Sequence, residues 1–222
     1  MIVFGTSVHR VVAAIAAAAL LALAPQPLLA GAQVEEQLAP SVVAGLHRAI
    51  ADNPVPNDYA DRPGMRPWRD EMSRRLAAKL PDARSREDFI ATVHYEASRA
   101  GLDPQLVLGV IQHESAFRKY AISSADARGY MQVMPFWTRL IGAADHNLFN
   151  LCTNLRYGCV ILRHYLDVEN GDVYRALGRY NGSLGRSEYP SAVVAAIGRH
   201  WHWDAPAAAP KLGAVASPVA VR

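Results

Sequence analysis

One glutamate in the sequence has the spacing of a buried catalytic acid. Glu114 follows Val107 by seven residues and Val110 by four, so all three share one face of a predicted helix. Phe117, three residues further on, extends this apolar face. Burial disfavours the charged form of a carboxyl group and raises its pKa toward neutrality, which is the condition that general acid catalysis needs. The alternative is a glutamate at a helix end that faces solvent, as most helix glutamates do.

Short motifs continue from Glu114 toward the C-terminus. They are E-S-A-F from Glu114, S-S-A-D-A-R-G-Y-M-Q-V-M-P from Ser123, N-L-R-Y-G from Asn154 and Y-N from Tyr180. In this order they resemble the catalytic domain of soluble lytic transglycosylases, over about 100 residues from Gly101 to His200. The resemblance implies a goose-lysozyme-like fold and an enzyme that cleaves peptidoglycan.

The same resemblance implies roles for six residues of these motifs. Glu114 is the implied catalytic acid and base, Ser123 a hydroxyl near the glutamate and the sugar, Gln132 and Met134 residues that line the groove, Tyr180 the tyrosine that orients glutamate and substrate, and Asn181 its neighbour. Three of them have structural alternatives. Tyr180 is also compatible with ordinary core packing, Met134 with gap filling and Ser123 with a helix cap.

The implied reaction needs a single carboxyl group. Glu114 protonates the oxygen of the β-1,4 bond between N-acetylmuramic acid (MurNAc) and N-acetylglucosamine (GlcNAc), then removes the proton of the muramyl C6 hydroxyl as a 1,6-anhydro ring closes. A hydrolase usually needs a second carboxylate. Asp126 is the nearest candidate, so a muramidase of the same fold is one alternative, although we favour a solvated loop position for Asp126. A catalytically silent peptidoglycan-binding scaffold of a secretion or pilus system is the other.

The histidines of the sequence do not predict a metal site. His113 and Glu114 match the first two residues of the zinc motif H-E-x-x-H, but Phe117 stands where this motif needs its second histidine. His200 and His202 lack a third ligand nearby, and the tryptophans beside them are expected to pack against the closing helix rather than stack on a sugar. We therefore expect neither metal nor cofactor.

The periodicity predicts an all-α fold, lysozyme-like, with an N-terminal helical extension. No alternating strand pattern of useful length is present. The expected helices are 41–52, 66–80, 85–100 with Ser85 as its cap, 103–117, a short one within 129–142, 153–168, 172–180 and one that begins at 190. The chain then divides into 1–32, a signal peptide; 33–84, the helical extension; 85–203, the transglycosylase-like domain; and 204–222, a disordered Pro/Ala-rich tail.

The N-terminus has the pattern of a secretory signal. An apolar run after Arg10 ends in Ala30-Gly31-Ala32, which suits a signal peptidase, so the mature chain is expected to begin near Gln33. A retained membrane anchor is the alternative. We expect a periplasmic protein without a membrane anchor after cleavage, and a secretion, pilus or flagellar machine as a partner if the enzyme acts locally.

Export makes a disulfide between Cys152 and Cys159 the default expectation. On one continuous helix, two residues seven apart would have Cα atoms roughly 10 Å from each other, too far for a bridge. The bridge therefore requires Cys152 to lie in the loop before the helix. Two buried thiols are the alternative.

Charge and composition narrow the classes of partner. The chain has 23 Lys and Arg against 20 Asp and Glu, a formal net charge of +3, and 51% hydrophobic residues. No basic run indicates nucleic acid, whereas mild basicity suits the anionic cell wall. Peptidoglycan glycan strands are the expected partner of a monomeric enzyme.

Overall fold

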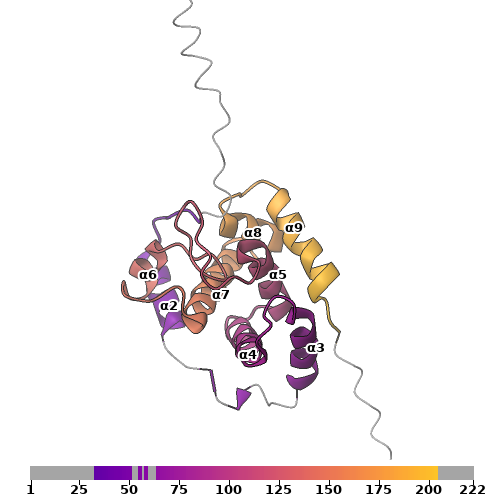
Figure 1. Ribbon diagram of the computed structural model, residues 1–222. Coiled ribbons are helices and arrows are strands. Elements are labelled where there is room, and N and C mark those ends of the chain that lie inside the picture. Colours follow the sequence, from indigo (N-terminus) through magenta and orange to yellow (C-terminus); the bar gives the residue numbers. More distant parts are fainter. Residues whose placement is uncertain (1–32, 52–54, 57, 60–63, 205–222) are drawn as a thin grey trace, which may run out of the picture. The chain divides into compact units, whose positions relative to one another are not determined.

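The computed structural model describes residues 33–51, 55–56, 58–59 and 64–204 (Figure 1). The predicted signal peptide and all of the predicted tail except its first residue lie outside these ranges. None of the helices in the described part of the chain has the length and apolar character needed to cross a membrane.

The described residues are helical, which confirms the predicted all-α class. The elements are α2 (Pro40–Ile50), α3 (Arg66–Leu76), α4 (Ala83–Arg99), α5 (Pro104–Ser115), α6 (Phe136–Ile141), α7 (Leu151–Val168), α8 (Val173–Asn181), α9 (Glu188–Ala196) and the π-helical turn η2 (Ile197–Trp201). The described ranges contain no named strand, and their isolated β-bridges join Arg128 to Ile122 and to Val133.

Aspartate side chains cap three of the described helices: α4 at Asp82, α5 at Asp103 and α8 at Asp172. One of these helices, α4, begins earlier than predicted. The Asp82 carboxylate accepts a hydrogen bond from the amide of Ser85 at 2.8 Å, so α4 begins at Ala83 and Ser85 lies in its first turn. The predicted cap at Ser85 is therefore wrong. Asp103 caps α5 as predicted, because its carboxylate accepts from the amide of Gln105 at 2.8 Å.

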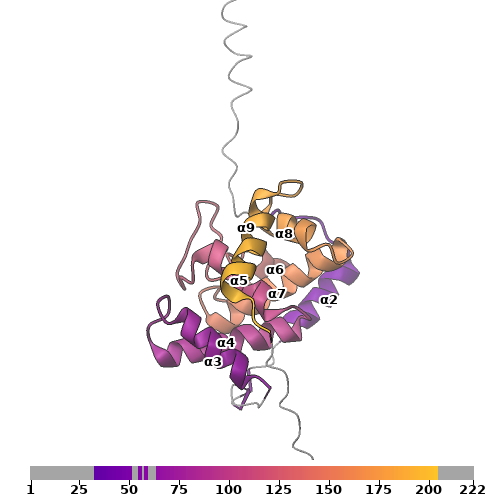
Figure 2. The same cartoon turned by 90° about the vertical axis from the view of Figure 1, so that its right-hand side faces the viewer.

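The core is built around α5, which lies between α4 and the α9–η2 segment (Figures 1 and 2). Its residues from Leu106 to Ile111 are all buried. Gly109 lets α9 approach closely, since a Cβ there would lie 2.7 Å from Cγ1 of Ile197 and 3.3 Å from the carbonyl of Val193. This close packing places the C-terminal end of α5 beside the beginning of α9.

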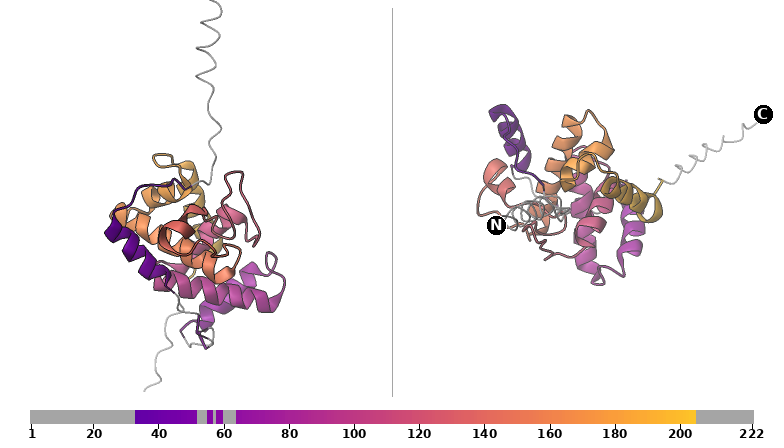
Figure 3. Two further views of the ribbon diagram at one scale, coloured as in Figure 1. Left: turned by 90° about the vertical axis from the view of Figure 1, so that its left-hand side faces the viewer. Right: turned by 90° about the horizontal axis from the view of Figure 1, so that it is seen from above.

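Both helices of the N-terminal extension pack on the rest of the fold. Helix α2 contacts α6 and α7, and Figure 3 shows it along that side of the molecule. Helix α3 packs on α4 and buries Trp68, Met72 and Leu76 in the common core. The division between extension and domain at residue 84 stays a prediction.

Both cysteines lie on α7, which begins at Leu151, and no disulfide joins them. The condition for the predicted bridge is therefore not met, because Cys152 and Cys159 lie on one continuous helix, where residues seven apart are roughly 10 Å from each other. The predicted disulfide is absent for this geometric reason. Cys159 is fully buried, and burial holds the pKa of its thiol well above the ordinary value.

Candidate active site

Glu114 lies one residue before the end of α5, where the chain leaves the helix through left-handed conformations at Ala116 and Phe117. Its Oε1 accepts a hydrogen bond of 2.5 Å from the hydroxyl of Tyr189, near the start of α9. Asn181, the last residue of α8, also hydrogen-bonds the carboxyl group through its side chain. Three helices therefore hold one carboxyl group.

Burial dominates the electrostatics of Glu114. The side chain keeps partial access to solvent, yet protein surrounds it so closely that desolvation raises its pKa from 4.5 to about 7, against the opposing effect of the two hydrogen bonds. The pKa of Tyr189 lies well above its ordinary value, because of burial and the nearby charge of Glu114. Tyr189 therefore remains a proton donor in the hydrogen bond while Glu114 titrates near neutral pH.

Tyr180, which the sequence motif pointed to, holds a neighbouring loop. It is almost completely buried, and its hydroxyl donates a hydrogen bond of 2.8 Å to the carbonyl of Met131. Burial and the charge of Glu114 hold its pKa well above the ordinary value, so the two side chains are near one another. The tyrosine that donates a hydrogen bond to Glu114 is Tyr189. The predicted role of Tyr180 in orienting the glutamate and substrate stays a prediction.

Ser123 and Gln132 make their bonds within the loop that precedes α6. The hydroxyl oxygen of Ser123 accepts from the amides of Ala125 and Ala127 at 3.2 and 3.1 Å, so this serine closes its own turn. The Gln132 side chain is buried and donates to the carbonyls of Ala121 and Gly129 at 3.1 and 3.0 Å. Their contacts with substrate stay predictions.

Met134 lies at the end of this loop and is partly buried against the core. Its backbone amide donates to the side-chain oxygen of Gln33 at 3.1 Å. The short helix predicted within 129–142 is confirmed as α6, which begins at Phe136. The residues before it are bonded as a turn, with Arg128 and Val133 exchanging two backbone hydrogen bonds of 3.0 Å. A role of Met134 in lining a groove also stays a prediction.

A family model described as the Transglycosylase SLT domain matches residues 91–193, a span that contains Glu114, Tyr180, Asn181 and Tyr189. Over residues 91–193 the chain is therefore similar to this family. The SLT domain thus covers the whole arrangement around the buried carboxyl group, and it confirms the resemblance that the sequence motifs indicated.

Several known proteins are similar to part of the chain. A protein named transglycosylase from Enterobacteria phage PRD1 is 31% identical over 129 residues, which are 55% of this chain and 48% of the phage protein. Membrane-bound lytic murein transglycosylase C of Mannheimia succiniciproducens is 41% identical over 64 residues, 29% of this chain and 18% of that protein. The chain thus spans about half or less of the length of these relatives.

Among solved structures, the lytic transglycosylase Slt from Pseudomonas aeruginosa is similar with a TM-score of 0.42 and 22% identity, over 82% of this chain and 37% of that chain. The likeness is weak.

Several SLT motif residues, among them Gly129, Met131, Asn154 and Gly158, pack against each other. The Asn154 side chain is completely buried, accepts from the amide of Met131 at 2.8 Å, and donates to the carbonyls of Arg128 and Leu148, both at 2.8 Å. A Cβ on Gly129 would lie 2.4 Å from this amide nitrogen, and one on Gly158 would lie 2.3 Å from the sulfur of Met131. These glycines are required because larger residues would push the loop away.

Asp126, the candidate second carboxylate, is exposed in the segment between α5 and α6. Its two oxygens accept from Nε and Nη2 of Arg128 at 3.0 and 2.9 Å, and its side chain is 56% exposed. This agrees with the solvated loop position that we favoured from the sequence. In the described residues, no group of three or more His, Cys, Asp or Glu side chains is arranged to hold a metal ion.

Tyr189 is the site residue that the sequence did not reveal. It lies 75 residues from Glu114, outside every motif that we recognised. The only local signal is its place before Pro190 at the start of a helix, and that signal says nothing about a contact so distant in sequence.

Proposed function

We propose that this protein is a peptidoglycan lytic transglycosylase with Glu114 as its acid and base. One observation carries the proposal: in an SLT domain, a carboxyl group is held by Tyr189 and Asn181 and has a pKa of about 7. A carboxyl group poised there is populated in both forms at neutral pH, so it can donate a proton in one step and accept one in the next.

A pKa of about 7 allows Glu114 to act as an acid in the first step and as a base in the second. Because Oε1 accepts the hydrogen bond of Tyr189, the acidic proton is expected on Oε2, which gives it to the bridging oxygen of the MurNAc–GlcNAc β-1,4 bond. The acetamido group of the substrate stabilises the positive charge at C1. The carboxylate then takes the proton of the C6 hydroxyl, whose oxygen closes on C1 and forms 1,6-anhydro-MurNAc. No water enters the products, so no second carboxylate is needed.

The alternative muramidase has weaker support. A hydrolase would place a second carboxyl group near the scissile bond, within roughly 5 to 9.5 Å of the acid. Asp126, the residue considered for this role, forms an ion pair with Arg128 on an exposed loop. A silent scaffold would not need a carboxyl group with a raised pKa.

The names of the relatives support a location in the cell envelope, since several are called membrane-bound lytic murein transglycosylase C. We propose peptidoglycan strands as the substrate of this chain and the periplasm as its location. A cleaved signal peptide and a role beside a secretion, pilus or flagellar machine remain part of the proposal.

Mass spectrometry of the fragments released from purified peptidoglycan tests this function. The mature protein should release anhydromuramyl ends, and Glu114→Gln should release none. Reducing ends, heavier by one water, would indicate a hydrolase instead. Equal release by wild type and Glu114→Gln would remove the proposed role of this residue.

A further inference from the structure

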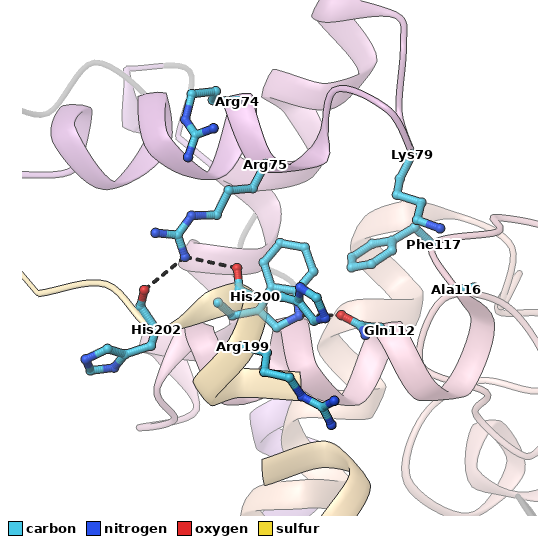
Figure 4. A pocket seen from close by; sticks show the side chains of 10 residues that line it. Arg74, Arg75, Lys79, Gln112, Ala116, Phe117, Arg199, His200 and His202 are labelled. Carbon is cyan, nitrogen blue, oxygen red and sulfur yellow. Dashed lines mark hydrogen bonds between the residues drawn. The ribbon is translucent and has the colours of Figure 1, made fainter. Parts of the chain in front are cut away.

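A basic cavity of about 630 Å³ lies between α3, α5 and η2 (Figure 4). Its lining residues are Arg74, Arg75, Lys79, Gln112, Ala116, Phe117, Arg199, His200, Trp201 and His202. Four of these ten side chains are permanent cations and none is an acid. The whole chain has a net charge of only +3, so this concentration of one sign is local.

The cavity and Glu114 lie on different sides of α5. Gln112 and Ala116 are one helical turn apart and both face the cavity. Glu114 is two residues from each of them, which corresponds to a rotation of roughly 200° about the helix axis. The cavity is therefore not part of the arrangement formed by Tyr189 and Asn181.

The cations of the cavity are only partly neutralised within the protein. Glu71 hydrogen-bonds Arg74 at 2.7 Å and Arg75 at 2.6 Å, and these two arginines lower its pKa to about 2. Arg75 also donates hydrogen bonds of 2.9 Å to the carbonyls of His200 and His202, which ties α3 to η2 (Figure 4). The carboxylate of Glu71 therefore pairs with two of the four cations that line the cavity.

Two cations are left for a ligand. In the described part of the chain, neither Lys79 nor Arg199 has an acidic partner, and Arg199 uses only its Nε, on the carbonyl of Ala195 at 3.2 Å. Trp201 is fixed beside them, since its indole nitrogen donates to Oε1 of Gln112 at 2.8 Å. A pocket lined by one sign of charge concentrates ions of the other sign, and guanidinium groups pair with carboxylates in charge-assisted hydrogen bonds.

We propose that this cavity binds the carboxylate groups of the peptide side chains of peptidoglycan. The proposal rests on the proposed function, because that function supplies the ligand: a polymer whose short peptides carry several free carboxylates. The volume lies within the usual range for small-ligand sites, roughly 300 to 1,000 Å³. A peptide of four residues spans up to about 14 Å when extended, more than the width of a helix, so it can pass α5 from a glycan at Glu114.

Calorimetric titration with a soluble stem tetrapeptide at low ionic strength tests the proposal. The mature wild-type protein should bind the tetrapeptide. The double variant Lys79→Gln/Arg199→Gln should bind it at least about tenfold more weakly, since each charge-assisted hydrogen bond contributes on the order of one decade in affinity. Lys119→Gln/Arg139→Gln, which removes the same charges from exposed positions away from the cavity, should keep wild-type affinity.

The outcomes separate this proposal from the catalytic one. Glu114→Gln should bind the tetrapeptide as wild type does, although it lacks the proposed activity. A protein that binds the peptide but releases no anhydromuramyl ends would contradict only the proposed function. An absent interaction, an equal loss in the two double variants, or binding of inorganic phosphate or duplex DNA in place of the peptide would overturn the inference. If the double variant fails to fold, the single variants Lys79→Gln and Arg199→Gln are titrated with the tetrapeptide instead, and each should bind it more weakly than wild type.

Discussion

The hydroxyl of Tyr189 donates a hydrogen bond to Oε1 of Glu114 at 2.5 Å. This bond favours the charged form of the glutamate, whereas the surrounding protein favours the neutral form and prevails. The pKa of about 7 is therefore a balance between α9, which supplies the tyrosine, and the closely packed end of α5. Mutation can change either the hydrogen bond or the burial of the carboxyl group.

Tyr189→Phe should raise the pKa of Glu114 above its present value of about 7, because the substitution removes a hydrogen bond to the carboxylate. The first step needs the protonated acid, so the basic limb of the profile of kcat/KM against pH should move to higher pH. The maximal rate should fall about tenfold as the carboxyl group loses its orientation. Tyr174→Phe is the matched control, since Tyr174 bonds Ser191 at 3.1 Å on the exposed side of α8 and α9. An unmoved basic limb in Tyr189→Phe would contradict the prediction.

Glu114 should also cost stability at alkaline pH. Its pKa is about 7 in the folded protein and 4.5 in the reference state, so the folded protein holds the proton more tightly. Stability should therefore fall as pH rises from 4.5 to 7, by up to about 3 kcal/mol. Glu114→Gln should gain that amount at pH 8 and nothing at pH 4, as measured by urea unfolding. Glu87→Gln, at an exposed position on α4, should show no such gain.

Asn154→Ala should destabilise the protein by about 3 kcal/mol, because the buried amide of Met131 and the carbonyl of Leu148 lose their partner. The carbonyl of Arg128 loses one of its two bonds and keeps the one from the amide of Val133. Thermal or urea unfolding gives the difference. Asn147→Ala removes an exposed cap on the amide of Phe149 and should change stability by about 0.5 kcal/mol or less. Equal losses in the two variants would show that Asn154 does not hold the loop.

Both thiols should be free in protein purified without reductant. Ellman's reagent should titrate two thiols per chain in denaturant. In the native state Cys159 should resist alkylation, because it is buried and its pKa is raised. A mass lower by two hydrogens, or no titratable thiol, would mean that α7 unwinds at Cys152.

Asp126→Asn should leave both the rate and the anhydromuramyl product unchanged within about twofold, since an exposed loop ion pair contributes little. Rate and product are read from the same fragment analysis as for wild type. A shift from anhydro to reducing ends, or a large loss of rate, would place this carboxylate at the reacting bond.

The periodic part of the architecture could be predicted from sequence. The apolar spacing before Glu114 gave a helix and a partly buried carboxyl group, and Asp103 gave its start, because these signals act within one or two turns. The cap of α4 was misplaced by three residues because Asp82 and Ser85 both suit that position, and only the geometry of the turn selects between them.

The contacts between distant segments could not be predicted. Tyr189 reaches Glu114 across 75 residues, and the segment before Phe136 is a turn because Asn154, on another helix, satisfies its backbone. No local sequence pattern predicts contacts between residues so far apart in the chain. The cysteine prediction failed for a related reason, since it depended on whether α7 begins before or after Cys152.

Arg75 joins two segments that are 125 residues apart, through its hydrogen bond to the carbonyl of His200. A ribosome completes α3 long before η2 exists, and closing so long a loop costs more conformational entropy than local helix formation does. We therefore expect the wall of the basic cavity to assemble last. Shortened chains that end before η2 would then keep Arg74, Arg75 and Lys79 but lack Arg199 and the wall that η2 forms, even where their helices form.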